Sequence, residues 1–107
     1  MLDFYDGGRR WGQGHAERQG RRCLMSAILH VAGQHGHGDG TDARHYLRAA
    51  LAPFWPQGRE VSDVDLIGYN DDSGDYDRVR ALILEALALA RAERGVPTYA
   101  EFALTER

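Results

Sequence analysis

The sequence predicts a small all-α domain, a bundle of three to four helices, and three observations support this. Apolar residues recur at spacings of three and four in several segments, which is the pattern of amphipathic helices. No segment shows the alternation or the enrichment in β-branched residues that is typical of strands. The 107 residues, 43% of them hydrophobic, suffice for one packed core. We therefore expect a single domain over residues 1–107, with an N-terminal arm (1–15), a helical core (16–95) and a short C-terminal tail (96–107).

The N-terminal arm is rich in glycine, with Gly7-Gly8 and Gly12-Gln13-Gly14 on either side of Trp11. Glycine loses much conformational freedom on folding, so this composition disfavours a stable helix. We expect an ordered arm that Trp11 anchors to the core. The first helix is expected from about Glu17 to Ala32, where apolar residues recur at helical spacing: Leu24, Ala27, Ile28 and Val31.

Four glycines among residues 33–40 predict a mobile loop after the first helix. The second helix is expected to begin with Thr41 as its N-cap and Asp42 in its first turn, and to end at Pro53. The prolines of residues 53–58 exclude a regular helix there and predict a turn. The inward face of the second helix comprises Ala43, Tyr46, Leu47, Ala50 and Leu51.

Two more helices complete the predicted bundle. A short helix begins with Ser62 or Asp63 as its cap and stops before Asn70, and residues 70–75 form a turn. The longest helix follows, with Asp75 as its N-cap and Gly95 as its C-terminal stop. Its apolar face comprises Tyr76, Val79, Leu82, Ile83, Ala86, Leu87 and Ala90.

Charge is unevenly distributed along a chain whose net charge is −3. Five arginines stand against three acids in residues 1–32, whereas residues 60–77 carry seven acids and no base. An acidic chain is repelled by nucleic acid unless its bases gather on one face, so nucleic-acid partners are disfavoured. Nucleic-acid binding is kept only as a third possibility, with a steep salt dependence, through Arg9, Arg10, Arg18, Arg21 and Arg22.

Composition also bears on the compartment. No apolar run approaches the roughly 20 residues that a transmembrane helix needs, so no membrane partner is expected. Residues 1–6 place acids where a secretory signal carries positive charge, and we therefore expect a cytoplasmic protein. Cys23 is the only cysteine, so the chain forms no internal disulfide and its core must hold by packing.

Several short motifs follow one another along the chain: Trp11-x-x-Gly14, Arg22-Cys-Leu-x-x-Ala-Ile28, Tyr46-Leu, Leu66-Ile-x-Tyr-Asn-Asp71 and Val79-x-x-Leu-Ile-x-x-Ala-Leu-x-Leu-Ala90. Over residues 8–94 this pattern resembles a family of small helical proteins of unknown function from actinobacteria and their phages. The chain departs from the pattern at Tyr69, where tryptophan is usual, and at Ser26, where a small residue, commonly glycine, stands. The resemblance implies an accessory or host-interaction protein and lends no reaction, cofactor or catalytic residue.

Cys23, a histidine and Asn70 have the residue types of a cysteine-dependent hydrolase or transferase, namely a nucleophile, a base and an orienting group. His45 is the best placed base, so the enzymatic alternative consists of Cys23, His45 and Asn70. A lone cysteine beside an apolar stripe is more often buried by packing, and we favour that interpretation. We also favour a structural role for Asn70-Asp71, because such side chains tie turns to the neighbouring backbone.

No metal or cofactor is expected. The pair His35-x-His37 has residue types that zinc, nickel and copper prefer, but the surrounding glycines leave the imidazoles unpositioned. The aspartates of residues 71–77 fail the calcium-loop register, because Leu82 stands where a bidentate glutamate is needed. Residues 7–14 match neither the Walker A loop nor the dinucleotide fingerprint, so they are a weak phosphate signal.

The favoured function is a protein-binding module without enzymatic activity, whose partner is another protein or a second copy of the chain. Aromatic residues that lie outside helical stripes are enriched at the centres of interfaces, although they more often plug the end of their own domain. The acids of residues 60–77 would steer a basic partner. The partner-binding residues are therefore expected to be Phe54, Trp55, Asp71, Asp72, Tyr99 and Phe102.

Overall fold

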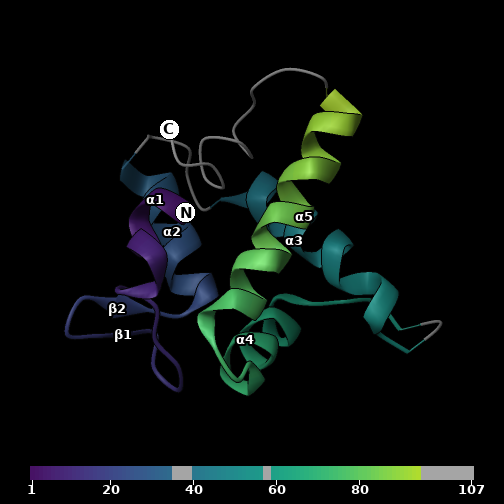
Figure 1. The fold of residues 1–107 in the computed structure, drawn as a ribbon. Coiled ribbons are helices and arrows are strands. Elements are labelled where there is room, and N and C mark those ends of the chain that lie inside the picture. Colours follow the sequence, from purple (N-terminus) through teal and green to yellow (C-terminus); the bar gives the residue numbers. More distant parts are fainter. Residues whose placement is uncertain (35–39, 57–58, 95–107) are drawn as a thin grey trace.

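Five α-helices make up most of the chain that the computed structural model describes, which comprises residues 1–34, 40–56 and 59–94 (Figure 1). The helices are α1 (Leu2–Tyr5), α2 (Leu24–Gln34), α3 (Thr41–Leu51), α4 (Asp63–Asp72) and α5 (Tyr76–Arg94). Two 3-10 turns, η1 (Asp6–Gly8) and η2 (Ala52–Phe54), and a hairpin of β1 (Glu17–Arg18) and β2 (Arg21–Arg22) accompany them. The predicted all-α class is confirmed, with this small hairpin as an addition.

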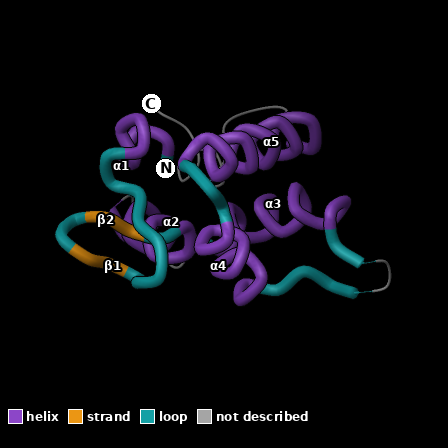
Figure 2. Tube along the Cα trace, turned by 60° about the horizontal axis from the view of Figure 1, so that its bottom comes forward, coloured by secondary structure: helices purple, strands orange, loops and turns teal. Residues whose placement is uncertain are grey.

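The core forms where α5 packs along α3 and where α2 and α4 enclose the same apolar interior (Figure 2). Every residue predicted for the inward face of α3 is buried. On α5 the predicted face is buried from Val79 to Ala90, and Tyr76 at its start is half-buried. Isolated helices as short as α2 and α3, with 11 residues each, are marginal in water, so burial against the other helices is what stabilises them.

A β-hairpin replaces the first part of the helix that was expected from Glu17. That expectation is wrong for residues 17–23, because α2 begins at Leu24. Gln19 and Gly20 have φ angles of 55° and 79°, and positive φ at both central residues makes the type I′ turn that joins two antiparallel strands. Strands of two residues are too short to display alternation, so the absence of a strand pattern was misleading. From Leu24 onward the predicted apolar stripe is confirmed.

The N-terminal arm contributes more to the core than its glycine content indicated. Met1, Leu2 and Tyr5 are buried, and the short helix α1 forms before the first glycine. The expectation of an arm without helix is therefore wrong for these residues. Gly8 then passes over the ring of Tyr76: its φ is +99°, and a Cβ there would lie 2.9 Å from Cδ2 of that ring. Glycine lets the backbone turn and lie against the start of α5 at this point.

Two boundaries around α2 and α3 differ from the sequence-based expectation. α2 continues through Gly33 to Gln34, two residues beyond its predicted end. The N-cap of α3 is Gly40, with φ 73°, so Thr41 is the first helical residue and not the cap. Gly40 takes this place because its backbone lies directly against the side chain of Ile28, where a Cβ would overlap a methyl group.

α4 begins as predicted but ends later. Ser62 caps it, and its hydroxyl and backbone exchange hydrogen bonds with Asp65 in a capping box. The prediction that this helix stops before Asn70 is wrong, since α4 runs to Asp72 and the turn begins at Ser73. The Ser73 hydroxyl donates to the Tyr69 carbonyl at 2.7 Å and so occupies one of the free carbonyls of the last turn.

The two remaining boundaries concern η2 and α5. Pro53 lies inside η2, because proline is tolerated in the first turn of a helix, and no regular α-helix forms over the described residues 53–56. Asp75 caps α5 as predicted, through a 3.2 Å hydrogen bond from the Arg78 amide to its Oδ1.

Five residues named in the sequence analysis lie outside the described residues: His35, His37, Gly95, Tyr99 and Phe102. Among the described helices, none has the length and apolarity needed to cross a membrane.

Candidate functional site

Asn70 joins three distant parts of the chain through one buried side chain. Its Oδ1 accepts hydrogen bonds from Trp11 Nε1 at 2.7 Å and from the Leu24 amide at 3.0 Å. Its Nδ2 donates to the Gly12 carbonyl at 2.9 Å and to Asp71 Oδ1 at 3.1 Å. These four bonds fill both acceptor and both donor positions of an amide. The structural role favoured for Asn70 and the anchoring role expected of Trp11 agree with this geometry.

Gln13 and Gly14 extend this attachment over the end of α4. Gln13 Nε2 lies 3.1, 3.0 and 2.6 Å from the carbonyl oxygens of Asn70, Asp71 and Ser73. The Gly14 amide donates to Asp71 Oδ1 at 2.8 Å. The last carbonyls of a helix have no partner within it, so the arm supplies the donors that this helix end needs. Residues 11–14 are therefore held firmly beside α4.

Next to this attachment, the hairpin and the arm border an open pocket of about 350 Å³. We call it the hairpin pocket; its lining residues are Trp11, Gly12, Gln13, His15, Arg18, Gln19 and Arg21. Of these seven described residues none is acidic, and two carry a guanidinium. The pocket therefore joins an aromatic wall to a cationic one.

The polar side chains of the hairpin contact one another and the backbone of the turn. Arg18 Nη1 lies 3.2 Å from His15 Nε2, and Arg18 pairs with Arg21 across the two strands. Glu17, the acid of β1, accepts a 2.8 Å hydrogen bond from the Gly20 amide through Oε2. Its carboxylate is thus engaged with the turn, and it is not among the residues that line the pocket.

A second hollow, of about 320 Å³, lies where the end of α3 and η2 meet α4 and α5. We call it the Phe54 groove; it is lined by Ala50, Pro53, Phe54, Tyr69, Ala81, Leu82 and Glu85. Phe54 is 79% exposed, whereas Trp55 is half-buried. The hairpin and the C-terminal part of α3 lie on opposite sides of the molecule in both views (Figures 1 and 2).

The residues of the enzymatic alternative occupy different environments. Cys23 is 5% exposed and directly precedes α2, and His45 is exposed on α3. Burial is the main cause that raises the pKa of the Tyr5 hydroxyl well above its ordinary value, and the electrostatic effects of Cys23 and Tyr76 add to it. Asn70 has all four of its hydrogen-bonding positions filled and leaves none for an imidazole. The geometry gives Asn70 a structural role and buries the side chain of Cys23.

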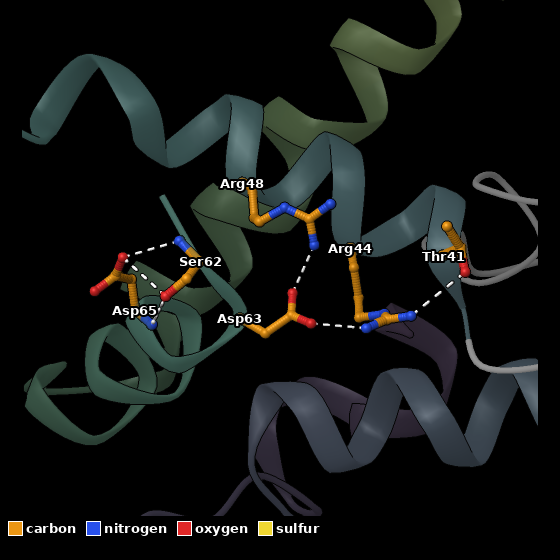
Figure 3. A network of polar contacts seen from close by, with 6 residues as sticks. All are labelled: Thr41, Arg44, Arg48, Ser62, Asp63 and Asp65. Carbon is orange, nitrogen blue, oxygen red and sulfur yellow. Dashed lines mark hydrogen bonds and ion pairs between the residues drawn. The ribbon is translucent and has the colours of Figure 1, made fainter. Parts of the chain in front are cut away.

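Much of the acidic segment is engaged within the chain. Asp63 binds Arg44 Nη1 at 2.7 Å and Arg48 Nη1 at 2.6 Å, which links α4 to α3 (Figure 3). Asp65 accepts the Ser62 amide at 2.9 Å and Arg59 Nη2 at 3.3 Å, and the hydrogen bond from the Ser62 backbone is the main reason why the pKa of Asp65 is lowered. The carboxylate of Asp71 is likewise occupied. The exposed acids of this segment include Glu60, Asp72 and Asp77.

Sequence reasoning missed the hairpin pocket. The signal that was available is Gln19-Gly20 between two pairs of polar residues, which is a weak form of the hairpin-turn signature.

As for metals, no group of three or more histidine, cysteine or acidic side chains is arranged to hold an ion within residues 1–34, 40–56 and 59–94.

A family model described as "Family of unknown function (DUF6197)" matches residues 7–95, which include residues 7–15 of the arm and all of α4. No curated protein and no solved structure shows significant similarity to the chain.

Proposed function

We propose that this chain, which belongs to the DUF6197 family of unknown function, is a protein-binding module that takes a short segment of its partner into the Phe54 groove. The observation that carries the proposal is the phenyl ring of Phe54, which is 79% exposed at the edge of an apolar hollow. Burying such a side chain releases about 2 kcal/mol, which is available to a partner that covers it.

The chemistry of the groove defines the partner. Its walls are apolar at Ala50, Pro53 and Leu82, and Glu85 is its acidic residue. The Tyr69 hydroxyl donates to the Arg78 carbonyl at 3.2 Å, so this polar atom is held by α5 and the tyrosine contributes mainly apolar surface. A complementary segment carries a bulky apolar side chain for the groove and a nearby arginine or lysine for Glu85.

Selection from a displayed library of random peptides tests this proposal, because it requires only the chemistry of the partner segment and not the partner's identity. We expect enriched peptides to share one large apolar residue close to a basic one. Phe54→Ala should weaken their binding at least about tenfold, since exposed aromatic anchors dominate such interfaces. Glu85→Gln should weaken it less and should remove most of its salt dependence.

Val64→Ala is the matched control, because Val64 is 74% exposed on α4 and does not line the groove. Phe54→Ala should keep the helix content of the wild type, because the side chain has little packing to lose. Failure to enrich any sequence of this type, or equal binding to wild type and Phe54→Ala, would exclude the groove as the partner site. A partner recovered from a native lysate is then examined with the same three variants.

A further inference from the structure

We propose that the hairpin pocket binds a small phosphate monoester that carries a planar ring, such as a nucleoside monophosphate. The proposal concerns a different face and a different ligand class from the Phe54 groove. It rests on three features of the pocket: its aromatic wall, a pair of opposed arginines, and its size.

The aromatic wall is the indole of Trp11. Its single polar atom, Nε1, is used by the hydrogen bond to Asn70, so the ring offers the pocket apolar π surface. The backbone on either side is fixed as well, since the Gly12 amide donates to the Arg22 carbonyl at 3.1 Å and the Arg22 amide donates to the Arg10 carbonyl at 2.7 Å. A wall that is already held in place binds a flat ring without further ordering.

The cationic wall consists of Arg18 and Arg21. They are directly opposed in the hairpin register, and two like charges placed opposite each other across a strand pair destabilise it. The carboxylate of Glu17, which could relieve them, is engaged with the Gly20 amide instead. An anion held between the two guanidinium groups would remove this repulsion. A guanidinium group can bind two oxygens of one phosphate through two parallel N–H donors.

The size of the pocket limits the ligand. A hollow of about 350 Å³ is at the lower end of small-molecule sites. His15 and Gln19 add an imidazole and an amide group around it, which can bond to the sugar hydroxyls and ring nitrogens of one nucleotide, whereas the amide nitrogen of Gln13 is already engaged with the end of α4. The pocket therefore suits a single nucleotide, and not a strand that runs across the surface.

Fluorescence of Trp11 provides the test. In a Trp55→Phe background Trp11 is the remaining tryptophan, because the chain has two. Adenosine monophosphate, inorganic phosphate, adenosine and a single-stranded oligothymidylate are titrated separately at low salt. We expect saturable binding of adenosine monophosphate, weaker binding of inorganic phosphate or adenosine alone, and loss of affinity as salt rises.

Arg18→Gln and Arg21→Gln should each weaken adenosine monophosphate at least about tenfold, as expected for a charge-assisted hydrogen bond. Both residues are exposed, so their removal should leave the fold intact, and circular dichroism checks this. Arg80→Gln is the control, because Arg80 is an exposed arginine on α5 that does not line the pocket. Phe54→Ala should bind the nucleotide as the wild type does, which separates this site from the protein-binding groove.

Three results would overturn the proposal. The first is the absence of saturable adenosine monophosphate binding at millimolar concentration. The second is equal affinity in the wild type and in the Arg18→Gln and Arg21→Gln variants. The third is binding of the oligothymidylate without binding of the mononucleotide, which would identify the arginines as a nucleic-acid surface instead.

Discussion

Trp11 donates its indole N–H to the side-chain oxygen of Asn70 across 2.7 Å, although the two residues are 59 positions apart in the chain. The same oxygen accepts the amide of Leu24 at the start of α2. One atom of α4 therefore fixes both the N-terminal arm and the first turn of a core helix. The hairpin pocket depends on this relationship, because Trp11 is one of its walls.

Asn70→Ala should destabilise the protein by about 3 to 5 kcal/mol. The substitution leaves the Trp11 N–H, the Leu24 amide and the Gly12 carbonyl without the partner they now have, and each buried polar group that loses its hydrogen bond costs about 1 to 3 kcal/mol. Urea unfolding measures the change. Asp72→Ala, an exposed change on the same helix, should shift stability by less than about 0.5 kcal/mol. Equal stability of the two variants would contradict the role assigned to Asn70.

Two glycines should respond to alanine with opposite signs. Gly40→Ala should destabilise by about 2 kcal/mol or more, because Gly40 has φ +73° and a Cβ would overlap the side chain of Ile28. Gly68→Ala should stabilise by about 0.5 to 1 kcal/mol, since Gly68 lies within α4 and a Cβ there meets nothing within 4 Å. Thermal unfolding of both variants measures the effects. Destabilisation by Gly68→Ala would mean that α4 is not helical at this point.

The helical stripes could be predicted from the sequence because their spacing reports directly on burial. Every residue assigned to the inward face of α3 is buried, and the same holds for α5 beyond Tyr76. The boundaries were less predictable, because they depend on partners far along the chain. α4 extends past Asn70 because Gln13 supplies donors to its last carbonyls, and no local pattern around Asn70 reveals a donor that lies 57 residues earlier.

The candidate sites also differ in how far they could be predicted, because some depend on local sequence and others on residues that are distant in the chain. Phe54 was expected to be a partner-binding residue because it is an aromatic residue outside the helical stripes, and its side chain is exposed. The hairpin pocket escaped prediction because its cationic pair is created by a turn at Gln19-Gly20, and strands of two residues leave almost no trace in composition. In the acidic segment the sequence indicated local roles for Asp71 and Asp75, but it gave no sign that Asp63 pairs with arginines of α3, which only the fold brings close.

The stability of the protein should fall as the pH drops below about 6.5, partly because of His30. Burial, followed by the positive charges of Arg22 and Arg10, lowers the pKa of His30 below 6.5. As the pH falls, the unfolded state therefore takes up the proton at a higher pH than the folded state does. The stability that neutral His30 contributes is fully present above pH 6.5 and is lost as the pH falls towards the pKa of the folded state. His30→Gln should show a shallower decline in urea midpoint between pH 7.5 and 5.5. The decline in urea midpoint of Arg10→Gln should lie between those of the wild type and His30→Gln. A decline in His30→Gln as steep as in the wild type would contradict the role assigned to His30.

Cys23 should react with a thiol reagent at least about a hundredfold more slowly in the native protein than in urea, because its side chain is 5% exposed and requires local opening to react. Ellman's reagent at neutral pH measures both rates. Slow native labelling agrees with a packing role for this thiol. Rapid native labelling that also depends on His45 would instead support the alternative of a cysteine-dependent enzyme.

Asp63 should contribute more to stability than an ordinary surface ion pair. It binds Arg44 and Arg48 at 2.7 and 2.6 Å, and the side chains of these arginines are only 18% and 29% exposed. Asp63→Asn keeps the shape but removes the charge that both guanidinium groups face, so we expect a loss of about 1 to 2 kcal/mol. Asp6→Asn is the matched control, because the Asp6–Arg9 pair is 3.6 Å long and mostly exposed, and it should change stability by less than about 0.5 kcal/mol.

Urea unfolding at low salt and in 1 M NaCl measures the effects of both substitutions. Because partly buried pairs are screened less than exposed ones, most of the Asp63 effect should persist in high salt. A loss no larger than that of Asp6→Asn would show that α3 and α4 are held together by their apolar faces alone.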